Sequence, residues 1–156
     1  MYLVFKLIHV VAVVMFLGNI TTGILWKAHG DLTGDPRIIA HTMQGIMKSD
    51  RWFTIPGVVV IIVAGFGAAG IGHLPLLGTG WILWSIVLFI ISGLAFMFRI
   101  APLQRRLFAL AQSAKNASDF DAERYRSLSR QWGFWGMVAL LTPAAALVLM
   151  IMKPEI

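Results

Sequence analysis

The pair of side chains best suited to chemistry stands near the start of the chain. Lys6 and His9 are three residues apart, so on a helix both would lie on one face. His9 falls inside a long apolar run, where an ionisable group costs several kcal/mol unless it is paired or used. A neutral imidazole there could ligate a haem iron or another metal, and Lys6 could reach a haem propionate. The alternative is a histidine that is satisfied near the lipid headgroups and a lysine that reaches water.

Further candidate ligands lie toward the same surface of the membrane. His73 follows the second apolar run and would be the second ligand of a bis-histidine site, although a loop histidine can equally be solvated. Met150 and Met152, near the end of the chain, could be axial ligands or could simply fill space in the core. Two other histidines fall at the opposite surface, too far away to share a metal: His29 and His41.

Other polar groups within the apolar runs are few. Asn19, Thr22 and Trp26 form a polar stripe on the first run, for which we expect interhelical hydrogen bonding. No run contains Asp or Glu, which argues against paired catalytic carboxylates, a carboxylate proton relay and an H-E-x-x-H metal site. The chain has no cysteine, which excludes disulfides, Cys-ligated zinc and iron–sulfur clusters.

Four apolar runs must position these side chains, at about residues 7–26, 53–72, 81–98 and 133–152. Each is long enough to cross about 30 Å of hydrocarbon at about 1.5 Å per residue. Hydrophobic residues make up 58% of the chain and charged residues only 13%, which indicates a membrane protein. The sequence therefore predicts an all-α fold, an integral membrane four-helix bundle with short cytoplasmic amphipathic helices, forming a single domain over residues 1–156. The first run lacks the features of a signal peptide and is interpreted as a retained helix.

The net charge of +6 follows the predicted topology. Four spans place residues 27–52 and 99–132 on one side, with eleven Lys and Arg, and leave two on the other side. This bias predicts a bacterial inner-membrane protein with both termini in the periplasm and the basic segments in the cytoplasm. The positive charge then serves topology and contact with anionic lipid, and no nucleic-acid partner is expected. Tryptophans mark the two membrane boundaries: Trp26, Trp52, Trp132 and Trp135 inside, Trp81 and Trp84 outside.

The two cytoplasmic segments predict helices of their own. Asp35 and Pro36 are a favourable helix start, and the residues that follow are apolar on one half and basic on the other. This pattern predicts a short amphipathic helix lying on the membrane surface, with its apolar stripe toward lipid or toward a partner. The second segment predicts a helical hairpin that breaks near Asn116-Ala117 and restarts at a capping box formed by Ser118 and Asp121.

Small residues recur at three- and four-residue spacing in the second and fourth runs. They are Gly57, Ala64, Gly65, Ala68, Ala69, Gly72, Gly133, Gly136 and the alanines at 144–146. Such residues let helices approach closely within the bundle, or between copies in a homo-oligomer. A close-fitting flat cofactor is the alternative.

Several of these features resemble known membrane families. The first helix opens Lys6-Leu7-Ile8-His9 and later has Gly18, followed by Arg51, Pro56 and Gly65 in the second, Pro143 in the fourth and Lys153-Pro154 at its end. This layout resembles the HemJ-type protoporphyrinogen oxidases and the related CopD-like copper-resistance membrane domains. Over essentially its full length, the chain more closely resembles a bacterial family of predicted integral membrane proteins without assigned function, through residues 80–93, 102–106 and 128–135.

The HemJ resemblance implies a b-type haem with His9 as axial ligand, and redox chemistry linked to a quinone. HemJ-type proteins carry a further lysine and histidine on a later helix, whereas the third run here, residues 81–98, has neither. The resemblance therefore implies haem binding without the activity of that enzyme.

We therefore expect a haem b protein that transfers electrons, with His9 as ligand, His73 as second ligand and Lys6 as propionate partner. A quinone or another redox partner would complete the transfer. One alternative is a non-enzymatic structural or transport-accessory protein. The other is handling of copper or another metal through His9, His73 and the outer methionines.

Overall fold

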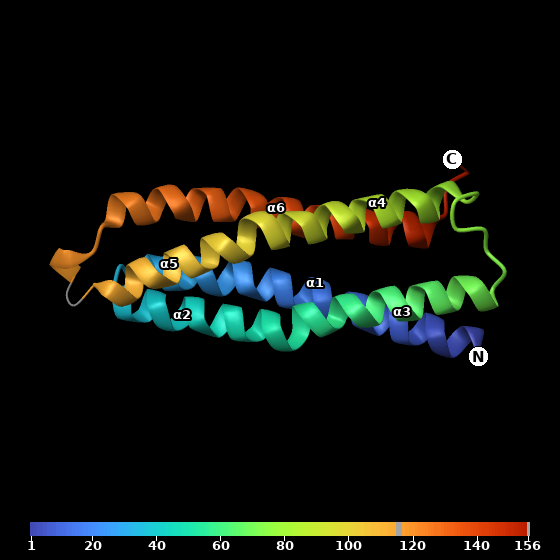
Figure 1. Ribbon diagram of the computed structural model, residues 1–156, viewed down its shortest axis with the longest axis horizontal. Coiled ribbons are helices and arrows are strands. Elements are labelled where there is room, and N and C mark those ends of the chain that lie inside the picture. Colours follow the sequence, from blue (N-terminus) through green and yellow to red (C-terminus); the bar gives the residue numbers. More distant parts are fainter. Residues whose placement is uncertain (115–116, 156) are drawn as a thin grey trace.

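The computed structural model describes residues 1–114 and 117–155, in which the chain forms four long helices and no strand (Figure 1). The first is α1 (Tyr2–Leu32) and the fourth is α6 (Ala122–Met152). The second runs without a break through α2 (Pro36–Ser49), the π-helical turn η1 (Asp50–Thr54) and α3 (Ile55–Ile71). The third does the same through α4 (Gly80–Ala95), the π-helical turn η2 (Phe96–Ile100) and α5 (Ala101–Ser113). A short 3₁₀ turn, η3 (Ala117–Asp119), precedes α6.

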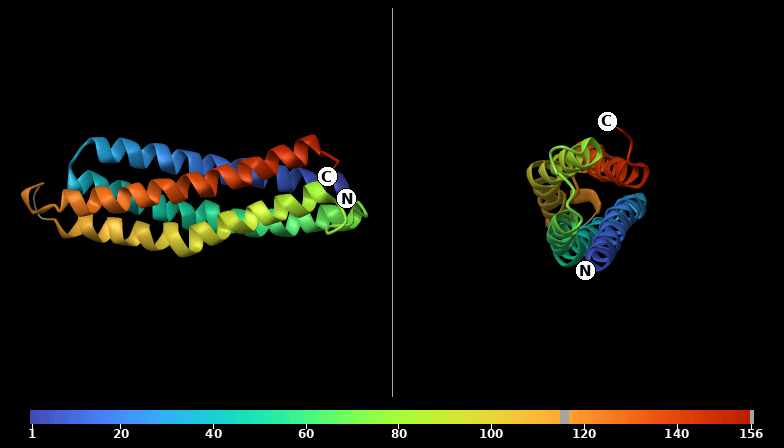
Figure 2. Two further views of the ribbon diagram at one scale, coloured as in Figure 1. Left: turned by 90° about the horizontal axis from the view of Figure 1, so that it is seen from above. Right: turned by 90° about the vertical axis from the view of Figure 1, so that its right-hand side faces the viewer.

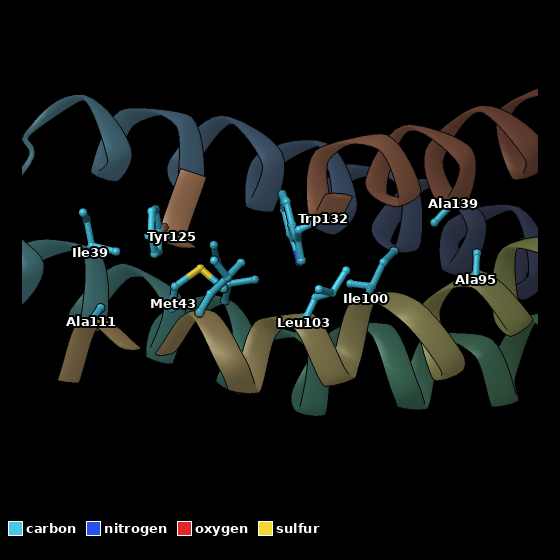
Figure 3. Packing of buried hydrophobic residues seen from close by; sticks show 11 residues of the cluster. Ile39, Met43, Ala95, Ile100, Leu103, Ala111, Tyr125, Trp132 and Ala139 are labelled. Carbon is cyan, nitrogen blue, oxygen red and sulfur yellow. The ribbon is translucent and has the colours of Figure 1, made fainter. Parts of the chain in front are cut away.

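The helices alternate in direction, so both termini lie at one end of an elongated bundle (Figures 1 and 2). We call this the terminal end, and we call the opposite end, formed by residues 27–52, 99–114 and 117–132, the basic end. At the basic end α2 packs on α1 and α5, and α5 packs on α6. The core there contains Ile39, Met43, Ile46, Leu103, Leu107, Ala111, Tyr125 and Trp132 (Figure 3). Toward the terminal end the packing becomes pairwise, with α3 on α1 and α4 on α6.

All four helices are long and apolar enough to cross a membrane, which agrees with the four predicted spans. Their 31 to 36 residues correspond to about 46 to 54 Å, against about 30 Å for the hydrocarbon core. Each helix therefore extends beyond the bilayer. Because the charged residues gather at the basic end, most of the excess length projects there.

The amphipathic segment at α2 differs from its prediction as a helix on the membrane surface. Its apolar stripe is buried within the protein, where Ile39 is 2% and Met43 0% exposed, and packs on α5. The reason is that α2 continues into α3 and so projects from the membrane beside α1. The two helices approach closely, since a Cβ placed on Gly30 would lie 2.8 Å from the Thr42 hydroxyl oxygen. The predicted orientation toward lipid is therefore wrong, whereas the start at Asp35 is right: its side chain accepts from the Arg37 N–H at 2.8 Å.

The second basic segment is a helical hairpin, as predicted, but α6 begins later than expected. Asp121, and not Ser118, is the N-cap, because its side chain accepts from the Arg124 N–H at 3.0 Å. Phe120 just before the cap packs on Tyr125, with ring centroids 5.3 Å apart, as in a hydrophobic staple. That contact fixes where the chain enters the helix. The predicted break in the hairpin is near Asn116 and Ala117, and Asn116 lies outside the described residues.

Small residues pack the helix pairs closely, as the sequence indicated. On α3, a Cβ at Gly67 would lie 2.6 Å from the ring of Phe5, so α1 approaches α3 closely there. On α4, Ser85 donates to the Ala146 carbonyl at 3.2 Å and Ser92 to the Ala139 carbonyl at 2.8 Å, which joins α4 to α6. Contact between small residues and interhelical hydrogen bonds is what holds helices together in lipid.

Candidate functional site

His9 lies at the contact between α1 and α3. Its Nδ1 is 2.9 Å from the carbonyl oxygen of Ile61, so Nδ1 carries the proton and donates it to this bond. The ring lies against Gly65, where a Cβ would come within 3.0 Å of it. The geometry leaves Nε2 as the nitrogen that could accept a hydrogen bond or ligate a metal.

Of the other predicted ligands, Lys6 lies about one turn before His9 on α1, whereas His73 lies in the segment after α3. Lys6 and His73 are exposed, and no hydrogen bond joins either of them to His9 among the described residues. His73 lies beyond the end of α3 at Ile71, which is about 9 Å along the helix from Gly65. In the part of the chain that the structure describes, no three His, Cys, Asp or Glu side chains gather to hold a metal ion. Two methionines lie at the end of α6, and two histidines are exposed at the basic end: Met150, Met152, His29 and His41.

A buried polar cluster around Asp50 is the strongest candidate site. Its Oδ1 accepts from Thr54 Oγ1 at 2.7 Å and from Asn19 Nδ2 at 3.3 Å. Its Oδ2 accepts from Gln104 Nε2 at 2.8 Å. Asn19 also donates to Thr54 Oγ1 at 2.8 Å and accepts from the Ser49 hydroxyl. Every described partner of the Asp50 carboxyl group is a hydrogen-bond donor.

The interhelical hydrogen bonding predicted for the polar stripe of α1 is thus confirmed for Asn19. The other two members of that stripe, Thr22 and Trp26, are exposed, and Trp26 is 58% exposed. Only Asn19 points into the bundle, so the prediction is wrong for the other two.

Two π-helical turns border this cluster. In η1 the N–H of Ile55 bonds to the carbonyl of Asp50, five residues back, and η2 has the same pattern. Pro56 and Pro102 are the second residues of α3 and α5, one residue beyond these turns. A proline has no N–H and its ring clashes with the carbonyl four residues back, so a wider turn before it relieves the clash. The two prolines therefore account for the wider turns on both sides of the cluster.

A cavity of about 480 Å³ lies between the two π-helical turns. Its polar lining comes from Asn19, Asp50, Thr54, Ser92, Gln104 and Arg105. Phe16 and Phe89, with ring centroids 5.7 Å apart, belong to its apolar wall. On the outer surface Val59 of α3 is 56% and Met97 of η2 is 65% exposed, and both line the cavity. The cavity therefore opens sideways, toward lipid, between the second and third long helices.

Trp132 lines the same cavity and has an unsatisfied donor. It is 5% exposed, and its Nε1, which can only donate, has no hydrogen-bond partner among the described residues. Figure 3 shows its ring projecting from α6 into the bundle toward Leu103 and Ile100. A buried donor without a partner costs about 1–3 kcal/mol. Trp132 therefore offers a hydrogen bond to an acceptor within the cavity.

A buried ion pair lies beside Trp132, toward the basic end. Lys27 is 4% exposed, and its Nζ donates to Asp31 Oδ2 and to Ser129 Oγ, each at 2.5 Å. Tyr125 donates to Asp31 Oδ1 at 2.6 Å. The Lys27 ammonium is also 5.2 Å from the centre of the Trp132 ring. These contacts join α1 to α6 and hold one side of the Trp132 ring.

The hydropathy pattern places Asp50 and Lys27 in the predicted cytoplasmic segments and gives no sign that either is buried. A signal was present, because the buried positions of α2 and η1 follow helical spacing without interruption: Ile39, Met43, Ile46, Asp50 and Thr54. A polar residue that continues the apolar face of a helix is expected to point into the core. The residues on other helices that contact Asp50 and Lys27 cannot be identified from such a pattern.

A family model described as "Predicted integral membrane protein (DUF2269)" matches residues 3–154. No curated protein and no solved structure matches the chain. The predicted resemblance to an integral membrane family without assigned function is thus confirmed, while the likeness to HemJ-type and CopD-like proteins gains no support from these comparisons. With the family model covering nearly its whole length, this four-span chain belongs to the DUF2269 family of predicted integral membrane proteins.

Proposed function

We propose that this protein binds a membrane-soluble small molecule in the cavity beside Asp50. The lateral opening between the second and third long helices carries the proposal, because it joins an apolar entrance to a polar interior. A molecule with an apolar tail could enter there from lipid and place its polar end against Asp50 and Trp132. A mainly apolar cavity with a few converging polar groups is the common form of a small-molecule site.

We further propose that the protein lies in the bacterial inner membrane with its basic end in the cytoplasm. The eleven-to-two division of Lys and Arg between the two sides supports this orientation. In this orientation both termini are periplasmic and the cavity opens to the cytoplasmic leaflet.

Filling the entrance with a side chain tests the binding proposal. Gly93 lines the cavity and has no atom within 4 Å of a built Cβ, so a larger side chain can start there without a clash, and we choose leucine to fill the entrance. Gly18 on α1 has equally open surroundings but lies outside the cavity lining, so Gly18→Leu is the matched control. The probe is hexadecanol carrying a photoreactive diazirine, an uncharged amphiphile, added to membranes that contain the full chain.

We expect the probe to label the cavity walls of the unmodified chain and of Gly18→Leu, and mass spectrometry of peptides locates the adducts. Gly93→Leu should lose most of this labelling. Equal labelling in the two leucine variants would overturn the proposal.

Haem b coordination by His9 is a second candidate function, which one observation favours. The bond from Nδ1 to Ile61 fixes the tautomer and orientation of the ring and leaves Nε2 for iron, as is usual for metal-bound histidines. Haem held there would supply one-electron transfer, with a quinone or another membrane partner. His9 does not line the cavity beside Asp50, so the two candidate sites are separate.

Absorbance of the purified protein tests this second function. A Soret band that is lost in His9→Ala and retained in His41→Ala would support it. Protein that stays colourless when expressed with ample haem would rule it out.

A further inference from the structure

We propose that the cavity receives the headgroup of a zwitterionic phospholipid, in which an ammonium group lies close to a phosphate. This inference rests on the proposed binding function and names the chemical class of its ligand. Three features carry it: a buried carboxylate without a cation, two donors suited to a phosphate, and the depth of the cavity in the membrane.

The carboxylate of Asp50 would hold the ammonium group. Asp50 is 8% exposed, and its described partners are neutral donors from Thr54, Asn19 and Gln104. Among the described residues, the only ion pair is that between Lys27 and Asp31, so no cation of the protein is in ion-pair contact with Asp50. A buried carboxylate is stable when a cation accompanies it. A ligand that brings its own positive charge supplies this balance.

Trp132 and Arg105 would hold the phosphate. The Trp132 N–H is buried without an acceptor, and Arg105 lines the same cavity. Phosphate oxygens are acceptors, and a guanidinium group binds them with two parallel hydrogen bonds. A headgroup with both charges therefore matches the cavity, whereas an anionic headgroup would bring only negative charge near Asp50.

The depth of the cavity also suits a headgroup. It lies between the π-helical turns η1 and η2, which also contain Trp52 and Arg99, and aromatic and basic residues of this kind are typical of a membrane surface. Its entrance is lined by Ile55, Val59 and Met97, which present apolar surface to an acyl chain. A volume of about 480 Å³ accepts a headgroup and the start of a chain, with the remainder of the lipid in the bilayer.

Native mass spectrometry of the delipidated full chain in detergent tests the headgroup. The probes share two oleoyl chains and differ only in the headgroup: phosphatidylethanolamine, phosphatidylcholine and phosphatidylglycerol. We expect the two zwitterionic lipids to bind about tenfold more tightly than the anionic one, because a charge-assisted contact is gained and a repulsion avoided. Asp50→Asn keeps the shape of the side chain and should remove that preference, whereas Glu123→Gln, an exposed charge on α6 outside the cavity lining, should retain it.

A ratio within about twofold in the unmodified chain would overturn the headgroup inference, as would an unchanged ratio in Asp50→Asn. The ratio in the unmodified chain decides the question even if Asp50→Asn does not fold. Gly93→Leu separates the two proposals. If it blocks all three lipids while their ratio is flat, the binding function stands and the headgroup inference fails; if it blocks none, the binding function itself fails.

Discussion

Replacing Lys27 by methionine removes the ammonium group that joins α1 to α6 beside Trp132. Methionine keeps an unbranched apolar side chain of similar length but cannot donate to Asp31 Oδ2 or Ser129 Oγ, both 2.5 Å from Nζ. The Asp31 carboxylate then keeps two donors, Tyr125 at 2.6 Å and Ser129 at 3.1 Å. The substitution therefore leaves a carboxylate that is hydrogen-bonded but has lost its cation.

The size of the effect follows from the burial of the pair. Removing one partner of a fully buried ion pair costs about 3–5 kcal/mol. The Asp31 side chain is 29% exposed and keeps its two hydroxyl donors, which lowers the expected cost to about 2 kcal/mol. Loss of the cation near the rings of Tyr125 and Trp132, at 5.4 and 5.2 Å, adds up to about 1 kcal/mol. We expect Lys27→Met to lower the free energy of unfolding by about 2–3 kcal/mol.

Reversible unfolding by SDS in mixed micelles, followed by circular dichroism, measures this change. Lys48→Met, at an exposed position on α2, is the control and should change the free energy by no more than about 0.5 kcal/mol. A double-mutant cycle with Asp31→Asn should give a coupling of about 1–2 kcal/mol between Lys27 and Asp31. A coupling near zero, or a Lys27→Met effect no larger than that of the control, would refute the ion-pair argument.

Three further predictions concern packing, capping and topology. Gly30→Ala should destabilise the protein by about 1–3 kcal/mol through its contact with α2, whereas Gly45→Ala, in open surroundings, should be neutral or stabilising, as measured by the same SDS unfolding. Asp121→Ala should cost about 1 kcal/mol in that assay and Ser118→Ala much less, and the reverse order would contradict the N-cap assignment. The chain has no cysteine, so His73→Cys provides a single thiol, which a membrane-impermeant maleimide should label in cells with a permeabilised outer membrane and an intact inner membrane. Labelling that needs disruption of the inner membrane would reverse the proposed orientation.

The spans could be predicted from the sequence because a bilayer imposes simple demands. A helix that crosses lipid needs a long apolar run, and amphipathic side chains mark its ends. In the structure, Arg99 lies 5.2 Å from the centre of the Trp135 ring and Lys153 lies 5.5 Å from that of Trp81, so basic and aromatic side chains pair at these positions. The start of α2 could also be predicted, because Asp35 is a favourable N-cap residue.

The joint between α2 and α3 could not be located from hydropathy. The polar stretch of Ser49, Asp50 and Arg51 resembles the end of a span, so the pattern predicts a separate helix for the residues before it. In the structure the helix continues, and Asp50 finds three donors on neighbouring turns and helices. A drop in hydropathy therefore marked the edge of the lipid but not the end of the helix.

The candidate site was less predictable than the fold because its residues come from four separate segments. Asn19, Asp50, Gln104 and Trp132 line one cavity but are spread over more than a hundred positions of the chain. Each also has an ordinary local explanation: the sequence pattern predicts Trp132 in the aromatic belt at a membrane boundary, whereas its ring is 5% exposed and lies within the bundle. Only the three-dimensional arrangement shows that its N–H is buried without a partner.

The length of the helices means that one chain folds in two solvents. At the terminal end the surroundings are hydrocarbon, so packing of apolar side chains between helices gains little from the hydrophobic effect. The helices there are held together by close packing, as at Gly67, and by interhelical hydrogen bonds, as from Ser92. At the basic end, which projects into water, burial of Met43 and Leu107 draws on the hydrophobic effect. Urea and cooling should thus loosen the projecting half first, while changes in lipid thickness should act on the other half.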